Sequence, residues 1–117
     1  MSITDDMTRY YGQKIGRFSK SVEGTFTTTG NSDELILLGE FNVLITGGIA
    51  TVEIQKSFDG GLNWYTISQD SAGTPASYTT SGGVVFNGVV EEREGNIEYR
   101  LACTAYTSGT ITYRMSQ

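Results

Sequence analysis

The sequence predicts an all-β protein: a two-sheet antiparallel β-sandwich, immunoglobulin-like or jelly-roll, with an extended N-terminal arm. Apolar and polar residues alternate over several short runs, which is the pattern of strands with one buried face. Gly-rich turns separate these runs, whereas Pro occurs only once, at Pro75. About eight strands at turn spacings of about 8 to 12 residues favour a sandwich, because an open sheet would leave too many edges exposed.

The first strands are expected between residues 22 and 38. Residues 22–29 (VEGTFTTT) are rich in β-branched side chains, which favour strands. Residues 30–33 (GNSD) are turn formers that should end this run. The continuous apolar run ELILL at 34–38 predicts a strand that is covered on both faces.

Two alternating runs follow, on either side of a turn at Gly47 and Gly48. They predict strands over residues 41–46 and 51–58, with alternate side chains pointing into the core. The inward side chains expected in these strands are Phe41, Val43, Ile45, Val52, Ile54 and Phe58.

Two further strands are expected at residues 97–104 and 110–116. The segment AYTSG between them predicts a short hairpin turn, so that the two strands pair with each other. The side chains expected on their apolar faces are Ile97, Tyr99, Leu101, Cys103, Ile111, Tyr113 and Met115.

A length of 117 residues predicts one domain with a modest core, whose stability would be increased by a partner. We expect residues 1–20 to form the arm and residues 21–117 to form the sandwich domain. Cys103 is the only cysteine, which excludes an intrachain disulfide and favours folding in a reducing compartment. We expect no export and no membrane partner, because no apolar run resembles a signal peptide or a span.

Charge is divided unevenly between the arm and the body. The arm has four basic and two acidic side chains, a net charge of +2, whereas residues 21–117 have four basic and eleven acidic ones, a net charge of −7. A merely solvated terminus is one interpretation, but the aromatic residues of the arm suit anchoring in a partner's pockets. Nucleic acid is not an expected partner, because the acidic body would repel phosphate. The expected partner-binding residues are Arg9, Tyr10, Tyr11, Lys14, Arg17, Phe18 and Lys20.

The motif SFDGGLNW at residues 57–64 resembles the Asp-box, a β-hairpin turn found in sialidases and in many unrelated β proteins. Its Asp can accept backbone N–H bonds, its Gly residues supply positive φ, and its Trp covers the hairpin. The motif occurs once, and Asn63 stands where Thr is usual. We interpret it as a structural turn, whose key residues are Ser57, Asp59, Gly61 and Trp64.

Catalysis and metal binding are not expected. The chain has no histidine, which removes the commonest general base and metal ligand. The acidic cluster within residues 91–94 lies beside Gly95, and we interpret it as a solvated turn. Cys103 alternates with core residues and is expected to be a small buried hydrophobe. We therefore expect no enzymatic activity, no metal and no cofactor.

Residues 39–117 contain an alternating strand that leads into SFDGG and a Trp, a strand ending in VVEE, and the terminal segment YRLACTAYTSGTITYRMSQ. In these features the chain resembles small β-sandwich virion proteins of tailed bacteriophages. The resemblance implies a virion structural role, and capsid decoration, or cement, is the form we expect. The protein would bridge major capsid proteins, associate with its own copies as a trimer, and be made in the host bacterial cytoplasm. In this hypothesis the arm lies in an acidic groove of the capsid.

Two alternatives remain open. The same body could belong to a phage tail, neck or head fibre, because one fold serves many functions. A carbohydrate-binding module is an alternative of another class, which would also allow contact with a host glycan. In that case a strip of aromatic side chains would stack against sugar rings. The candidates for such a strip are Trp64, Tyr65, Tyr78 and Tyr106.

Overall fold

The computed structural model describes residues 20–117, apart from the side chains of Val84 and Val85. This part of the chain is all-β, and it contains no helix long and apolar enough to cross a membrane. Its strands are β1 (Ser21–Phe26), β2 (Gly30–Asn31), β3 (Leu35–Ile36), β4 (Gly39–Thr46), β5 (Ile49–Ser57), β6 (Tyr65–Thr66), β7 (Ser77–Thr79), β8 (Val84–Glu92), β9 (Glu98–Ser108) and β10 (Ile111–Ser116).

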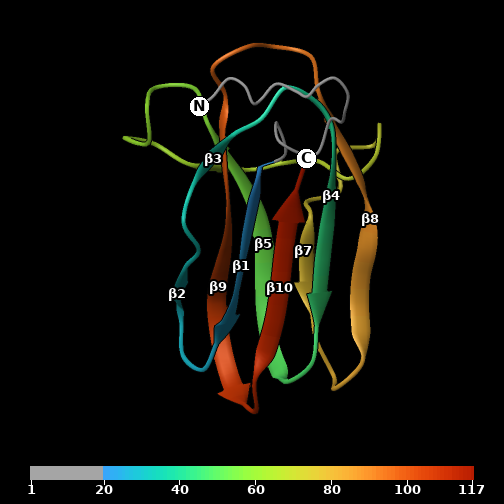
Figure 1. Cartoon of the computed structure of the whole chain (residues 1–117). Coiled ribbons are helices and arrows are strands. Elements are labelled where there is room, and N and C mark those ends of the chain that lie inside the picture. The colour runs from blue at the N-terminus through green and yellow to red at the C-terminus, as the bar shows by residue number, and fades with distance from the viewer. Residues whose placement is uncertain (1–19) are drawn as a thin grey trace, which may run out of the picture.

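The strands form two antiparallel sheets that pack face to face as a β-sandwich (Figure 1). One sheet has the order β1-β10-β4-β8. The other has the order β2-β9-β5-β6, with β3 also pairing with β9 and β7 also pairing with β5. The all-β sandwich predicted from the alternating pattern is therefore confirmed.

The connection between β9 and β10 crosses from one sheet to the other. The hairpin predicted at residues 105–109 is wrong, because β9 pairs with β5 whereas β10 pairs with β1 and β4. The turn at Gly47-Gly48 makes the same kind of crossing, since β4 and β5 also belong to different sheets. The alternation of apolar residues is identical for strands that pair and strands that face each other, and this explains the error.

The two crossings lie against each other and require glycine. Gly47, Gly48 and Gly109 have φ values of 85°, 62° and 80°, a region that glycine adopts without steric cost. A Cβ on Gly47 would lie 2.6 Å from the carbonyl oxygen of Thr110, and one on Gly109 would lie 3.0 Å from the Cα of Gly48. At these two connections the backbone therefore packs directly on backbone.

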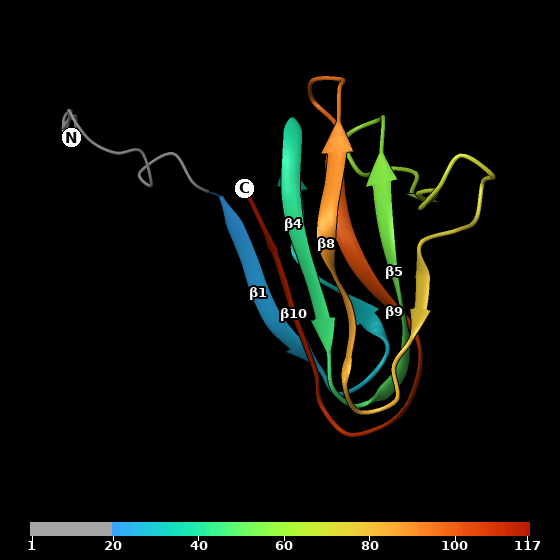
Figure 2. The same ribbon diagram turned by 90° about the vertical axis from the view of Figure 1, so that its right-hand side faces the viewer.

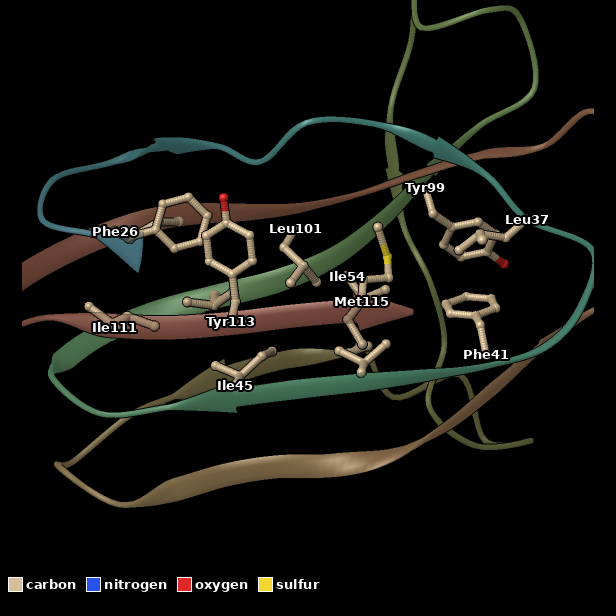
Figure 3. Close-up of a cluster of buried hydrophobic side chains, with 14 of the residues drawn as sticks. Phe26, Leu37, Phe41, Ile45, Ile54, Tyr99, Leu101, Ile111, Tyr113 and Met115 are labelled. Atoms are coloured by element: carbon tan, nitrogen blue, oxygen red, sulfur yellow. The ribbon is translucent and has the colours of Figure 1, made fainter. Parts of the chain in front are cut away.

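The core fills the space between the sheets, as Figure 3 shows. Phe41 meets Tyr99 edge-on across the sandwich at 4.7 Å between ring centroids, and Phe26 stacks on Tyr113 at 4.6 Å. Of the side chains predicted to point inward from residues 41–46, 51–58, 97–104 and 110–116, all but one are buried, which confirms the alternation. The buried ones are Phe41, Val43, Ile45, Val52, Ile54, Ile97, Tyr99, Leu101, Cys103, Ile111, Tyr113 and Met115.

Phe58 is the exception, because its side chain is 54% exposed. The alternation fails there since β5 ends at Ser57 and the chain turns away from the sheet. The run 34–38 is also not covered on both faces: Leu37 is buried, but Ile36 and Leu38 point outward. Its strand β3 has only two residues and lies at the outer edge of the sheet, beside β9.

The first strand is shorter than the predicted run 22–29, because β1 ends at Phe26. Gly30 and Asn31, which were expected in a turn, pair as β2 with Cys103 and Ala102. The chain thus leaves one sheet after β1 and joins the edge of the other within a few residues.

The glycine at the second crossing should be intolerant of a side chain. Gly109→Ala should lower the free energy of unfolding by about 2 kcal/mol, because it adds strain at positive φ and a contact with Gly48. Urea unfolding followed by circular dichroism measures this difference. Gly30→Ala is the matched control, since no atom lies within 4 Å of the added Cβ, and a loss of the same size there would contradict the explanation.

Candidate functional site

The motif turn, defined as Ser57–Trp64, is a closed hydrogen-bonded unit at the end of β5. Ser57 Oγ donates to Asp59 Oδ1 at 2.7 Å and accepts from the backbone N–H of Gly61 at 2.9 Å. Asn63 donates twice to Asp59, from its backbone N–H at 2.9 Å and from its side-chain amide at 2.6 Å. Asn63 thus supplies the donors at the position where the motif usually has Thr.

These donors determine the pKa of Asp59. It is lowered from its ordinary value of 3.8 to about 2, chiefly by the side-chain amide of Asn63 and then by the Asn63 backbone N–H and Ser57. The carboxylate is fully exposed, so the effect comes from hydrogen bonding and not from burial. The Asp59 carboxylate therefore acts as a hydrogen-bond acceptor within its own turn.

Trp64 closes the turn over the outer face of the second sheet. Its indole N–H donates to the carbonyl oxygen of Gly61 at 3.0 Å, and the guanidinium of Arg100 lies 4.2 Å from its ring centroid. Arg100 also donates to Gln55 Oε1 at 2.9 Å. The guanidinium of Arg100 thus covers one face of the Trp64 ring in a cation–π contact.

Exposed apolar side chains gather at one end of the sandwich, which we call the arm end. Ile36, Glu98 and Ser57 lie in one row across β3, β9 and β5, so the motif turn and the β3 segment are at the same end (Figure 1). Five of the seven exposed large hydrophobic side chains among the described residues lie in these two segments or next to them. They are Ile36, Leu38, Phe58, Leu62 and Tyr65.

Lys20, the last residue of the arm, lies at this same end. Lys20 and Gln117 exchange two backbone hydrogen bonds, which continue the pairing of β1 with β10. Lys20 Nζ donates to the carbonyl oxygen of Ile36 at 2.8 Å, and the side-chain amide of Gln117 donates to Leu38. The other expected partner-binding residues lie outside the described residues; they are Arg9, Tyr10, Tyr11, Lys14, Arg17 and Phe18.

A cleft of about 580 Å³, the flank cleft, lies between β8 and the β6–β7 segment. Figure 2 views this flank, with β8 in front and β4 and β5 on either side of it. The tilted ring pair Tyr78 and Phe86, with centroids 4.8 Å apart, forms part of its wall, and Val89 and Glu91 line it from β8. Its volume is in the range of about 300 to 1,000 Å³ that is usual for ligand pockets.

A buried polar group, Glu92, lies beside the cleft. Its Oε1 accepts from the Tyr99 hydroxyl at 2.7 Å and from Lys56 Nζ at 3.2 Å, and its Oε2 accepts from the backbone N–H of Glu94 at 3.0 Å. Burial is the largest influence and raises the pKa of Glu92, but the three donors together outweigh it and lower the pKa. Burial also raises the pKa of Tyr99, and its bond to Glu92 adds to this effect.

The interpretation of residues 91–94 as a solvated turn is therefore wrong for Glu92, which is 7% exposed. It belongs to the end of β8, where the strand alternation places its side chain inward. Sequence reasoning missed this group because a run of charged residues conceals the period of two. The signal that could have found it is the continuation of that period from Phe86 through Val90.

The described residues contain no group of three potential metal ligands. Cys103 is buried, and burial raises the pKa of its thiol, as expected for a small hydrophobe. The four aromatic residues of the proposed glycan strip are not gathered: Trp64 lies under Arg100, Tyr78 lies against Phe86, and Tyr106 pairs opposite Ala50. Tyr65 pairs opposite Lys56, six residues along β5 from Ala50.

Comparisons with known proteins give no relative: no family model, no curated protein and no solved structure matches the chain.

The pKa of Asp59 can be tested through Asn63. Asn63→Ala should raise it from about 2 toward 3.8, because the largest stabilising donor is lost. Carboxyl titration by NMR measures it, and Asp70, whose pKa is lowered by Thr74, should titrate unchanged. Because the folded pKa lies below the unfolded one, Asp59 stabilises the wild type above about pH 4, and this stabilisation is lost as the pH falls through 2.

The Tyr99–Glu92 bond should contribute to stability. Tyr99→Phe should lower the free energy of unfolding by about 1 to 2 kcal/mol, because a buried carboxylate loses a donor. It should also raise the pKa of Glu92. Tyr65→Phe is the control, since the Tyr65 side chain is exposed. Equal stability of the two variants in urea would mean that the bond has no net effect.

Proposed function

We propose that the chain is a structural protein of a bacteriophage particle, a decoration protein that stabilises the capsid by bridging major capsid proteins. The observation that supports a binding role is the arm end, where five exposed apolar side chains lie at the same end of the sandwich as Lys20, the residue at which the arm joins the sandwich. Exposed apolar residues concentrated in one region are typical of protein interaction sites. The resemblance of residues 39–117 to virion proteins gives the class of particle.

The polar groups of the body favour binding over catalysis. Glu53 accepts hydrogen bonds from Thr66 at 2.7 Å and from Gln55 at 3.2 Å. Glu92 and Asp59 are likewise occupied by donors of their own chain. Acid and base groups that are fully used in structural contacts have little capacity to exchange protons with a substrate.

Apolar contact should supply most of the affinity at the arm end. Complete burial of a Leu or Phe side chain is worth about 1.5 to 3 kcal/mol, whereas an exposed ion pair contributes about 0 to 1 kcal/mol. Leu62 is 84% exposed and Leu38 is 56% exposed, so both have most of this surface available for a partner. The opposite end of the sandwich has the glycine crossings and one exposed apolar side chain, Ile49.

Attachment to particles can be tested with a phage that encodes the chain, using particles made without it and purified protein added back. The double variant Leu38→Ser, Leu62→Ser should bind at least tenfold more weakly in a sedimentation assay. Both side chains point to solvent in the free chain, so folding should be retained and can be checked by circular dichroism. Ile49→Ser at the opposite end is the matched control and should bind like the wild type.

Equal binding of the double variant and the wild type would contradict docking by the arm end. The number of copies per particle separates decoration from the alternative of a tail, neck or head-fibre component. Hundreds of copies support decoration, whereas about a dozen or fewer would place the chain in the tail apparatus.

A further inference from the structure

The strand β8 is an edge that the described chain leaves unpaired on one side. In the sheet order β1-β10-β4-β8, it pairs only with β4. Charged side chains and Pro are the usual devices that protect an edge strand from pairing. Residues 84–90 of this strand, VVFNGVV, contain neither. The exposed side chain of Val89 adds apolar surface to this edge. An extended peptide laid along β8 would therefore complete the sheet.

The flank cleft beside this edge suits aromatic side chains. Phe86, Tyr78 and Ile67 supply apolar wall, and the volume of about 580 Å³ exceeds that of one aromatic side chain. The tilted pair Phe58 and Tyr65, with ring centroids 6.2 Å apart, lies beside Lys56, a residue that lines the cleft. A peptide entering the cleft would thus meet aromatic surface along its path.

The β8 side of the cleft has Glu91 at its border, and Lys56, the cation that lines the cleft, is already paired with Glu92 at 3.2 Å. Glu91 lies directly opposite Glu40 across β8 and β4, a like-charged pair that is unfavourable by itself. Glu91 has one exposed partner, Arg93, at 3.5 Å, and no described cation forms an ion pair with Glu40. The eleven carboxylates of residues 21–117 exceed its four cations, and the other four cations of the chain all lie in residues 1–20.

We propose that the flank cleft binds residues 9–18 of the arm of a second copy of this chain. The arm segment would extend along the free edge of β8, with an aromatic side chain in the cleft and its basic side chains near Glu91 and Glu40. The sequence alone suggested an acidic groove on the capsid as the partner of the arm. The chain itself has a cleft with apolar walls and carboxylates, Glu91 and Glu40, on the strands of one side.

The position of Lys20 favours a second copy as the source of the whole segment. This residue continues β1, and β10 and β4 separate β1 from β8, a distance of about 14 Å at about 4.8 Å per strand. Phe18 precedes Lys20 by two residues, which span at most about 7 Å. The arm of the same copy therefore cannot place the whole segment 9–18 against β8.

Each copy then contributes one arm and one cleft, a head-to-tail arrangement that gives a closed ring where the rotation between copies closes and an open filament where it does not. A trimer is such a ring. This inference goes beyond the proposed function and does not depend on it, because it concerns contacts between copies of the chain in the absence of any particle.

The occupant of the cleft can be identified in the full-length chain by photo-crosslinking. Benzoylphenylalanine in place of Val89 is irradiated in an equal mixture of copies labelled with ¹⁴N and ¹⁵N, and the products are mapped by mass spectrometry. We expect crosslinks to peptides from residues 1–20, with about half of them joining a light copy to a heavy copy. The same probe in place of Thr25, on the opposite edge strand, is the control and should give no such product.

Crosslinks within single copies only, crosslinks from β8 to β8, or no crosslinks at all would each overturn the proposal.

Charge reversal supplies a second measurement, by sedimentation velocity of the full chain. Glu91→Lys should weaken self-association roughly five- to tenfold, because it replaces an attraction by a repulsion. Glu23→Lys makes the same charge change on β1, at the far edge of the sheet, and should leave self-association unchanged. Equal effects of the two substitutions would contradict binding at the cleft.

Discussion

The structure depends on two of the places where the chain crosses from one sheet to the other, the β4–β5 and β9–β10 connections. At Gly47-Gly48 and at Gly109 the backbone takes positive φ values, and the two crossings pack against each other without intervening side chains. Since β4 pairs with β10 and β5 pairs with β9, the crossings hold the central strands of both sheets in register. The apolar faces of those strands are then directly opposed and bury Ile45, Leu101 and Tyr113.

This arrangement gives the two ends of the sandwich different structures. The end with the crossings is compact, because close backbone contact excludes bulky side chains there. The arm end carries the motif turn, the β3 segment and Lys20 (Figure 1). Internal hydrogen bonds fix the shape of the motif turn, so its exposed residues Phe58 and Leu62 are presented on a rigid support. A surface that is ordered before binding loses little conformational entropy on association.

The alternation of apolar residues predicted most of the core and the fold class, because a period of two reports which face of a strand is buried. It could not predict which strands pair, since β9 and β10 have the same alternation whether they lie side by side or face to face. It also failed where an element ended, at Phe58, and where charge concealed the period, at Glu92. The residues of the motif turn could be named from the sequence because their contacts are local. The flank cleft could not, because it is formed by segments distant in sequence, such as Ile67 and Phe86.

The central functional claim is that the arm end is the end that attaches the protein to its particle. Cryo-electron microscopy of a phage that encodes the chain tests this claim most directly, because a sandwich of this size can be oriented in the density. The account predicts that Leu38 and Leu62 face the shell and that Gly47-Gly48 and Gly109 point to solvent. A sandwich bound by the crossing end, or particles that contain no copy of the chain, would contradict it.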